Sequence, residues 1–133
     1  TSTADGGWGI YTTCSHAKIT GCSFSSNSAK VRGGGLADMK STSQIDSCSF
    51  PGNGAEDYGG GIYVDGYGSF NEPDITNCSV TNCIADFGGG NCNNFSDSYI
   101  SNCVVTDNTG TQAGEEPLPQ PDIMRAGLRQ PLR

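Results

Sequence analysis

The chain has 133 residues, a formal net charge of −7, 20 glycines and seven cysteines. This length suits one ordinary domain, and no stretch approaches the roughly 20 apolar residues of a membrane-spanning helix. Between residues 41 and 110 there are nine acidic residues and no Lys or Arg. Nucleic-acid binding is therefore excluded, because it needs a basic surface to neutralise phosphates. With one histidine and no CxxC pair, zinc sites of the finger or ribbon type are excluded as well.

Four glycine-rich stretches are each expected to begin a strand after a tight turn with positive φ. They read "GWGIY" (7–11), "GGGLA" (33–37), "GGGIY" (59–63) and "GGGNC" (88–92). The inward residues of these strands, Ile10, Leu36 and Ile62, are predicted to stack, and their ladder ends at Asn91. No Lys followed by Ser or Thr comes after the glycines, so they are not expected to form a phosphate-binding loop.

An isoleucine and a cysteine three residues apart follow each glycine-rich stretch. They occur in "ITGCSF" (19–24), "IDSCSF" (45–50), "ITNCSV" (75–80) and "ISNCVV" (100–105). Because side chains alternate along a strand, both residues can point inward only if the backbone turns a corner between them. The residue before the cysteine is Gly21, Ser47, Asn77 or Asn102. Gly and Asn tolerate the left-handed conformation of a sharp corner, and Ser47 fits less well.

Both motifs recur every 25 to 30 residues through four copies, which indicates a repeat protein. The repeats lack the periodicity of helical solenoids and the leucines of leucine-rich repeats, and they are too short for propeller blades. We therefore predict an all-β fold, a parallel β-helix of about four coils, over residues 1–110. Residues 111–133 are proline-rich and are predicted to form a disordered or loosely capping tail, in which "DIMRAGLR" (122–129) could make a short helix.

Stacking of coils about 4.8 Å apart would align equivalent residues in buried ladders. The predicted ladders are Ile19, Ile45, Ile75 and Ile100; Cys22, Cys48, Cys78 and Cys103; Phe24, Phe50, Val80 and Val105; and Asn27, Asn53 and Asn108, with Cys83 in place of a fourth asparagine. Neighbouring cysteines of the ladder are expected to stay unpaired, because their parallel side chains disfavour a disulfide. A bridge between Cys83 and Cys92 is an alternative that the sequence leaves open.

A family resemblance rests on "FSSN" (24–27), "GGGL" (33–36), "FPGN" (50–53) and "GGGI" (59–62). These stretches resemble the repeats of polymorphic outer membrane proteins and of related pectin-lyase-like, right-handed parallel β-helices. The resemblance implies a right-handed coil and a secreted or surface-exposed protein. It implies no single activity, because this fold hosts lyases, hydrolases, epimerases, adhesins and structural spikes. The missing initiator Met and signal peptide are expected of a mature form or a fragment.

Candidate binding residues are Tyr11 and Tyr63, which take the same outward position two coils apart. With Trp8, Tyr58 and Tyr67 nearby, they could form an aromatic platform for sugar rings, although ordinary strand aromatics are the favoured interpretation. Asp57 and Asp86 are the nearest approach to a catalytic carboxylate pair and are interpreted as solvated acids, so no catalytic residue is predicted.

We thus expect a non-catalytic extracellular or cell-surface module for adhesion or carbohydrate contact, whose partner is a polysaccharide or a cell-surface glycan. The alternative is part of a polysaccharide lyase, hydrolase or epimerase. No metal site or cofactor is predicted, apart from weak calcium binding at the acidic surface.

Overall fold

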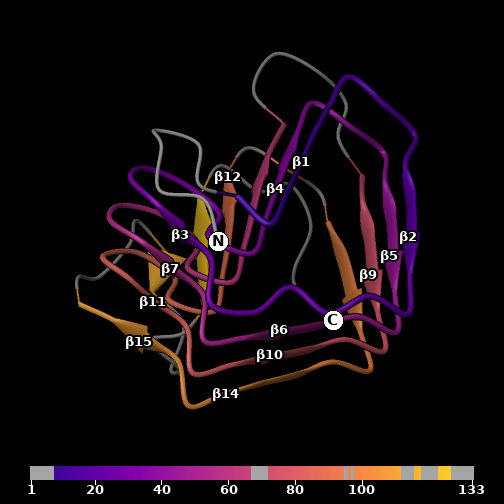
Figure 1. Cartoon of the computed structure of the whole chain (residues 1–133). Helices are drawn as coiled ribbons and strands as arrows, with labels where there is room; N and C mark the ends of the chain where they lie inside the picture. The colour runs from indigo at the N-terminus through magenta and orange to yellow at the C-terminus, as the bar shows by residue number, and fades with distance from the viewer. Residues whose placement is uncertain are drawn as a thin grey trace.

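A computed structural model describes residues 8–66, 72–94, 96, 98–111, 116–117 and 123–126. These residues wind into a solenoid of about four coils, and each sheet takes one short strand from successive coils (Figure 1). Among the described residues there is no helix. The predicted β-solenoid is confirmed.

Four sheets run along the solenoid. The first contains β1 (Ile10–Thr13), β4 (Leu36–Met39), β8 (Ile62–Asp65), β12 (Asn91–Asn94), β17 (Ile123–Ala126) and β16 (Glu116–Pro117). The second contains β2 (Lys18–Thr20), β5 (Gln44–Asp46), β9 (Asp74–Thr76) and β13 (Tyr99–Ser101). The third contains β6 (Ser49–Pro51), β10 (Ser79–Thr81) and β14 (Val104–Thr106). The fourth contains β3 (Ser28–Ala29), β7 (Gly54–Ala55), β11 (Ile84–Ala85) and β15 (Thr109–Gly110).

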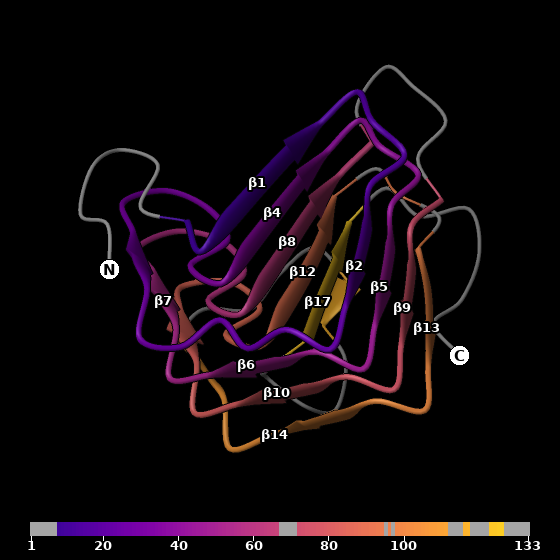
Figure 2. The same ribbon diagram turned by 45° about the vertical axis from the view of Figure 1, so that its right-hand side comes forward.

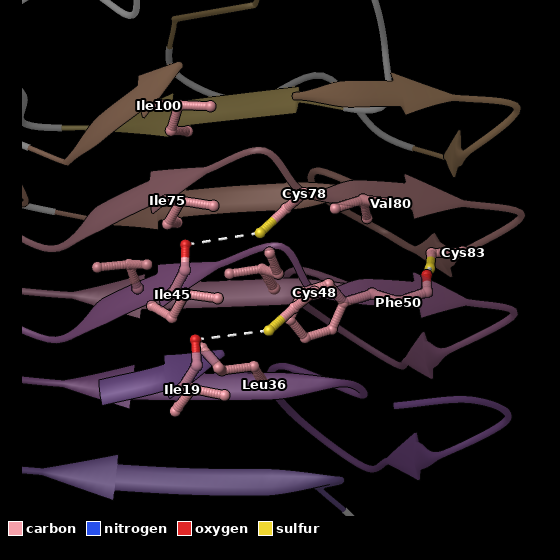
Figure 3. Packing of buried hydrophobic residues seen from close by; sticks show 12 residues of the cluster. Ile19, Leu36, Ile45, Cys48, Phe50, Ile75, Cys78, Val80, Cys83 and Ile100 are labelled. Carbon is pink, nitrogen blue, oxygen red and sulfur yellow. Dashed lines mark hydrogen bonds between the residues drawn. The ribbon is translucent and has the colours of Figure 1, made fainter. Parts of the chain in front are cut away.

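Neighbouring coils pair in parallel, and their register matches the predicted ladders (Figure 2). The isoleucine ladder is continuous, and its members are all at most 8% exposed: Ile19, Ile45, Ile75 and Ile100. Phe50, Val80 and Val105 align in the third sheet, and the ring of Phe24 stacks on that of Phe50 with centroids 5.3 Å apart. These ladders form one continuous core through the solenoid (Figure 3).

Both ends of the third sheet are bounded by corners with left-handed backbone. The predicted corner before each cysteine is present, with φ of 62° at Gly21, 55° at Ser47, 53° at Asn77 and 52° at Asn102. A second corner lies at the turn where the asparagine ladder was expected, and positive φ occurs just before each ladder position, at Ser26, Gly52, Asn82 and Asp107. Gly, Asn, Asp and Ser dominate the two sets because short or absent side chains tolerate this conformation best.

The glycine triplets serve two purposes. The first glycine of each triplet has the expected positive φ, 61° at Gly33, Gly59 and Gly88. The second glycine lies against the backbone of a neighbouring coil, so a Cβ at Gly60 would be 2.4 Å from the carbonyl oxygens of Gly89 and Ile84. A side chain there would push the coils apart, which explains why a single glycine is not enough.

The short helix considered for residues 122–129 is wrong. Residues Ile123–Ala126 form β17, which pairs in parallel with β12, and β16 pairs with β17 in antiparallel fashion. The physical reason is that the free edge of β12 carries N–H and C=O groups that an added strand satisfies and a helix would leave unpaired. Apart from Thr111 and β16, the other residues of the tail lie outside the described part of the chain, and their disorder stays a prediction.

Candidate functional site: an aromatic strip outside the first sheet

The first sheet is covered on both faces near its middle. All four residues of β8 are buried, although a strand with one solvated face would bury only every second residue. Ile62 and Val64 pack into the core of the solenoid, whereas Tyr63 and Asp65 point to the outer face. Something must therefore cover the outside of this sheet.

The cover comes from residues just before the glycine triplets. Arg32, Tyr58 and Phe87 lie in register on successive coils, joined by isolated parallel bridges. The rings of Tyr58 and Phe87 stack with centroids 5.3 Å apart, and both pack against a small cluster of Tyr63 and Cys92. This row forms a second layer over the outer face of the first sheet.

Tyr63 lies beneath that layer. The register confirms that Tyr11 and Tyr63 share one position two coils apart, with Ala37 between them. However, Tyr63 is only 2% exposed, so the open aromatic surface expected at this residue is not found. Its ring lies 6.1 Å from that of Tyr58, and the guanidinium of Arg32 sits 5.5 Å above it. Alternation along a strand predicts the outward direction of Tyr63 correctly but cannot predict what folds over it.

The polar groups below the layer hold Tyr63 in place. Its hydroxyl donates a hydrogen bond to Oδ2 of Asp65 at 3.0 Å and accepts one from Nδ2 of Asn94 at 3.4 Å. Burial, helped by the negative charge of Asp65 and opposed by Arg32, raises the pKa of Tyr63 above its usual value. Burial likewise raises the pKa of Cys92 to about 12. Both groups thus stay protonated at neutral pH, and their role here is structural.

The accessible aromatic surface begins two coils before Tyr63. Tyr11 is 45% exposed, and its ring stacks on Trp8 with centroids 4.5 Å apart and planes inclined by 29°. The indole N–H of Trp8 donates to the carbonyl oxygen of Arg32 at 2.6 Å, which links this pair to the outer layer. We call the resulting surface the aromatic strip; its members are Trp8, Tyr11, Arg32, Tyr58 and Phe87. It runs across successive coils, along the length of the solenoid.

Tyr67, the remaining aromatic residue considered for the platform, lies outside the described residues. The carboxylates considered for catalysis are on neighbouring coils, as the hydrogen bond of 2.8 Å from the Phe87 N–H to the Asp57 carbonyl shows. The side chain of Asp86 accepts a hydrogen bond from Thr111 Oγ1 at 2.6 Å, and Asp57 is exposed. Within the described ranges, no three His, Cys, Asp or Glu residues gather as metal ligands would. Across the same ranges, no helix is long and apolar enough to span a bilayer.

Sequence reasoning also missed polar residues inside the solenoid. Asp38 and Asn93 belong to one inward row of the first sheet and are both fully buried. Asp38 Oδ1 accepts hydrogen bonds from Thr12 Oγ1 and from Ser43 Oγ, the latter at 2.9 Å, and Asn93 Oδ1 accepts one from Ser98 Oγ at 3.1 Å. Their position two residues after Leu36 and Asn91 was the signal that could have placed them inside.

The coil length, the parallel sheets and the stacked ladders can now be compared with known proteins. The family described as "right handed beta helix region" matches residues 1–116. The chain belongs to this right-handed β-helix family. Comparison with curated proteins and with solved structures yields no match. The handedness implied by the resemblance is thus supported, whereas the specific likeness to polymorphic outer membrane protein repeats stays a prediction.

Proposed function

We propose that this β-helix is a non-catalytic extracellular or cell-surface module that contacts carbohydrate through the aromatic strip. The observation that carries the proposal is the stacked pair of Trp8 and Tyr11. Tyr11 is its exposed member, and Trp8 joins the pair to the row of Arg32, Tyr58 and Phe87. Flat aromatic faces bind the apolar C–H faces of sugar rings, and they lose little conformational entropy on binding because their rotamers are already restricted by stacking. A strip that crosses several coils suits a chain of sugars better than a single ring.

The charge of the protein favours a neutral glycan. The net charge is −7, and the strip itself carries one cation, Arg32. Glu56 and Asp57 directly precede Tyr58, and Asp86 directly precedes Phe87, so a polyanionic polysaccharide would be repelled along that part of the strip at low ionic strength. Adhesion follows from this contact when the glycan is displayed on a cell or in a matrix.

The proposal is tested with the full chain on a glycan array, followed by calorimetric titration of the neutral oligosaccharide that binds best. Trp8→Ala and Tyr11→Ala should each weaken binding by about two- to twelvefold, since an aromatic contact is worth about 0.5 to 1.5 kcal/mol. Val104→Ala is the matched control, because Val104 is an exposed apolar residue, 56% exposed, on the third sheet.

Two results would contradict the proposal. Binding that survives both aromatic substitutions would show that the glycan does not contact the aromatic strip. Release of unsaturated or reducing ends from a polysaccharide would show turnover and would favour the lyase, hydrolase or epimerase interpretation instead.

A further inference from the structure

The cysteine ladder brings thiols of neighbouring coils together. None of the seven cysteines is in a disulfide. Cys48 and Cys78 are buried, as predicted, but Cys103 is half-buried and Cys22 is exposed. All four ladder cysteines were expected to be buried. Cys22 and Cys103 are less buried than expected because each of them has a ladder neighbour on one side only. Any reagent therefore meets the ladder at Cys22 or at Cys103.

Three of the four ladder thiols lean toward the coil before them. The thiol of Cys48 points to the carbonyl oxygen of Ile19, and that of Cys78 to the carbonyl oxygen of Ile45, both at 3.6 Å (Figure 3). Cys103 repeats the pattern with Ile75, at 3.4 Å. The sulfur of Cys103 consequently lies over Cys78, whose backbone N–H donates a hydrogen bond to it at 3.4 Å.

Cys78 and Cys103 have the separation that a disulfide needs. They directly precede Ser79 and Val104, which are partners in the parallel pairing of β10 and β14. Adjacent coils place such Cα atoms about 4.8 Å apart, within the range of roughly 4.4 to 6.8 Å that disulfides span. The parallel directions of the side chains are the remaining obstacle. Since Cys103 already leans over Cys78, a change of rotamer at Cys78 brings the two sulfurs together.

The pair also has the electronic asymmetry of a reactive dithiol. The interaction between the two neighbouring side chains lowers the pKa of Cys103 and raises the pKa of Cys78. The bond from the Cys78 N–H further stabilises a thiolate on Cys103. The accessible sulfur of Cys103 is therefore the better nucleophile. The buried sulfur of Cys78 keeps its proton until a mixed disulfide has formed on Cys103.

We propose that Cys78 and Cys103 are a redox modification site, at which a low-molecular-weight disulfide such as oxidised glutathione cross-links the last two coils of the cysteine ladder. The Cys103 thiolate attacks one sulfur of oxidised glutathione, and the first glutathione leaves as its thiolate. Cys78 then loses its proton, and its sulfur attacks the Cys103 sulfur of the mixed disulfide. The second glutathione leaves, so that the protein loses two electrons and two protons while one oxidised glutathione becomes two reduced ones.

The test treats the reduced full chain with oxidised glutathione, blocks remaining thiols and maps the peptides. Cleavage before aspartate separates 74–85, which contains Cys78 and Cys83, from 97–106, which contains Cys103. The expected product is a cross-link between these two peptides that tandem mass spectrometry assigns to Cys78. Thermal unfolding should shift to a higher midpoint on oxidation and return on reduction, because the cross-link restricts the unfolded chain.

Variants distinguish the roles of the two thiols. Cys103→Ser should abolish the cross-link and the shift in midpoint, whereas Cys78→Ser should leave Cys103 trapped as a mixed disulfide with glutathione. Cys48→Ser, one coil earlier in the same ladder, is the matched control and should cross-link like the wild type. The wild-type map needs no variant to fold: glutathione found on Cys22 alone, or a cross-link to Cys83 in place of Cys78, would overturn the proposal.

Discussion

At the scale of single residues, the asparagine ladder shows what holds one coil to the next at the second corner. Asn53 donates through Nδ2 to the Phe24 carbonyl oxygen at 2.6 Å and accepts at Oδ1 from the Asn27 N–H at 3.0 Å. Cys83 makes the same two contacts one coil later: its thiol donates to the Phe50 carbonyl oxygen at 3.1 Å and accepts from the Asn53 N–H at 3.4 Å. The position thus requires a side chain that both donates and accepts a hydrogen bond. The amide of asparagine and the thiol of cysteine both meet this requirement.

Asn53→Ala should therefore lower the free energy of unfolding by about 2 to 6 kcal/mol, because it leaves two backbone groups of the neighbouring coil unpaired and each costs about 1 to 3 kcal/mol. Urea denaturation followed by circular dichroism measures the change. Asn27→Ala is the matched control: Asn27 is half-buried and donates to Asn53, and its loss should cost about 1 kcal/mol. Equal losses in the two variants would contradict the bridging role of Asn53.

At the scale of the elements, stacking rather than strand propensity decides where the chain turns. The strands have two to four residues, and the corners between them are set by left-handed residues and by the close approach of glycine backbones. Gly54 and Gly60 illustrate the contrast within one coil. A Cβ on Gly54 would meet Ile84 Cγ2 at an ordinary 3.5 Å, whereas a Cβ on Gly60 would collide with two carbonyl groups.

Gly60→Ala is accordingly expected to destabilise the protein by about 3 kcal/mol, the upper end of the usual cost of overpacking. Gly54→Ala should instead be neutral or stabilise by about 0.5 kcal/mol, since alanine restricts the unfolded chain and fits the folded one. Both changes are measured by urea denaturation of the purified variants. A Gly60→Ala protein as stable as Gly54→Ala would mean that the coils can separate at no cost.

The sequence predicts those elements whose residues face a repeated environment. Ile19, Ile45, Ile75 and Ile100 could be placed inside because the same side chain recurs at the same point of each coil. The burial of Tyr63 could not be predicted, because it depends on how Arg32 and Tyr58 fold back over the strand. Tyr11 is exposed as expected, and its role as a binding residue stays a prediction. Phe87 and Arg32 could not be placed beside it, because they carry no local signal that links them to a surface on another coil.

At the scale of the whole molecule, the solenoid keeps several thiols in its interior and under its outer layer. Burial raises the pKa of Cys48, Cys83 and Cys92 above the value of 9.0 for an ordinary thiol. In the unfolded chain these thiols ionise near that ordinary value, whereas in the folded protein they stay protonated to higher pH. Their contribution to stability is fully present below about pH 9 and is lost as the pH rises above it.

The free energy of unfolding should consequently fall between pH 9 and pH 11, measured by urea denaturation under reducing conditions. Cys83→Asn, which keeps both contacts of this position without a thiol, should show a smaller fall than the wild type over the same range. Tyrosines and lysines titrate in both proteins and cancel in the comparison. Parallel pH profiles for the two proteins would show that Cys83 ionises as readily inside the fold as outside it.

Because every coil pairs with the next in the same register, such a protein can change its length by whole coils. Each coil presents to the following one the same row of backbone groups, the same isoleucine and the same hydrogen-bonding turn. A tandem duplication of one such segment in the gene would therefore insert a complete coil between two existing coils, without altering the contacts of the coils beyond it. Homologues are expected to differ by whole multiples of this segment, and partial insertions are expected only where the chain bulges outward between strands.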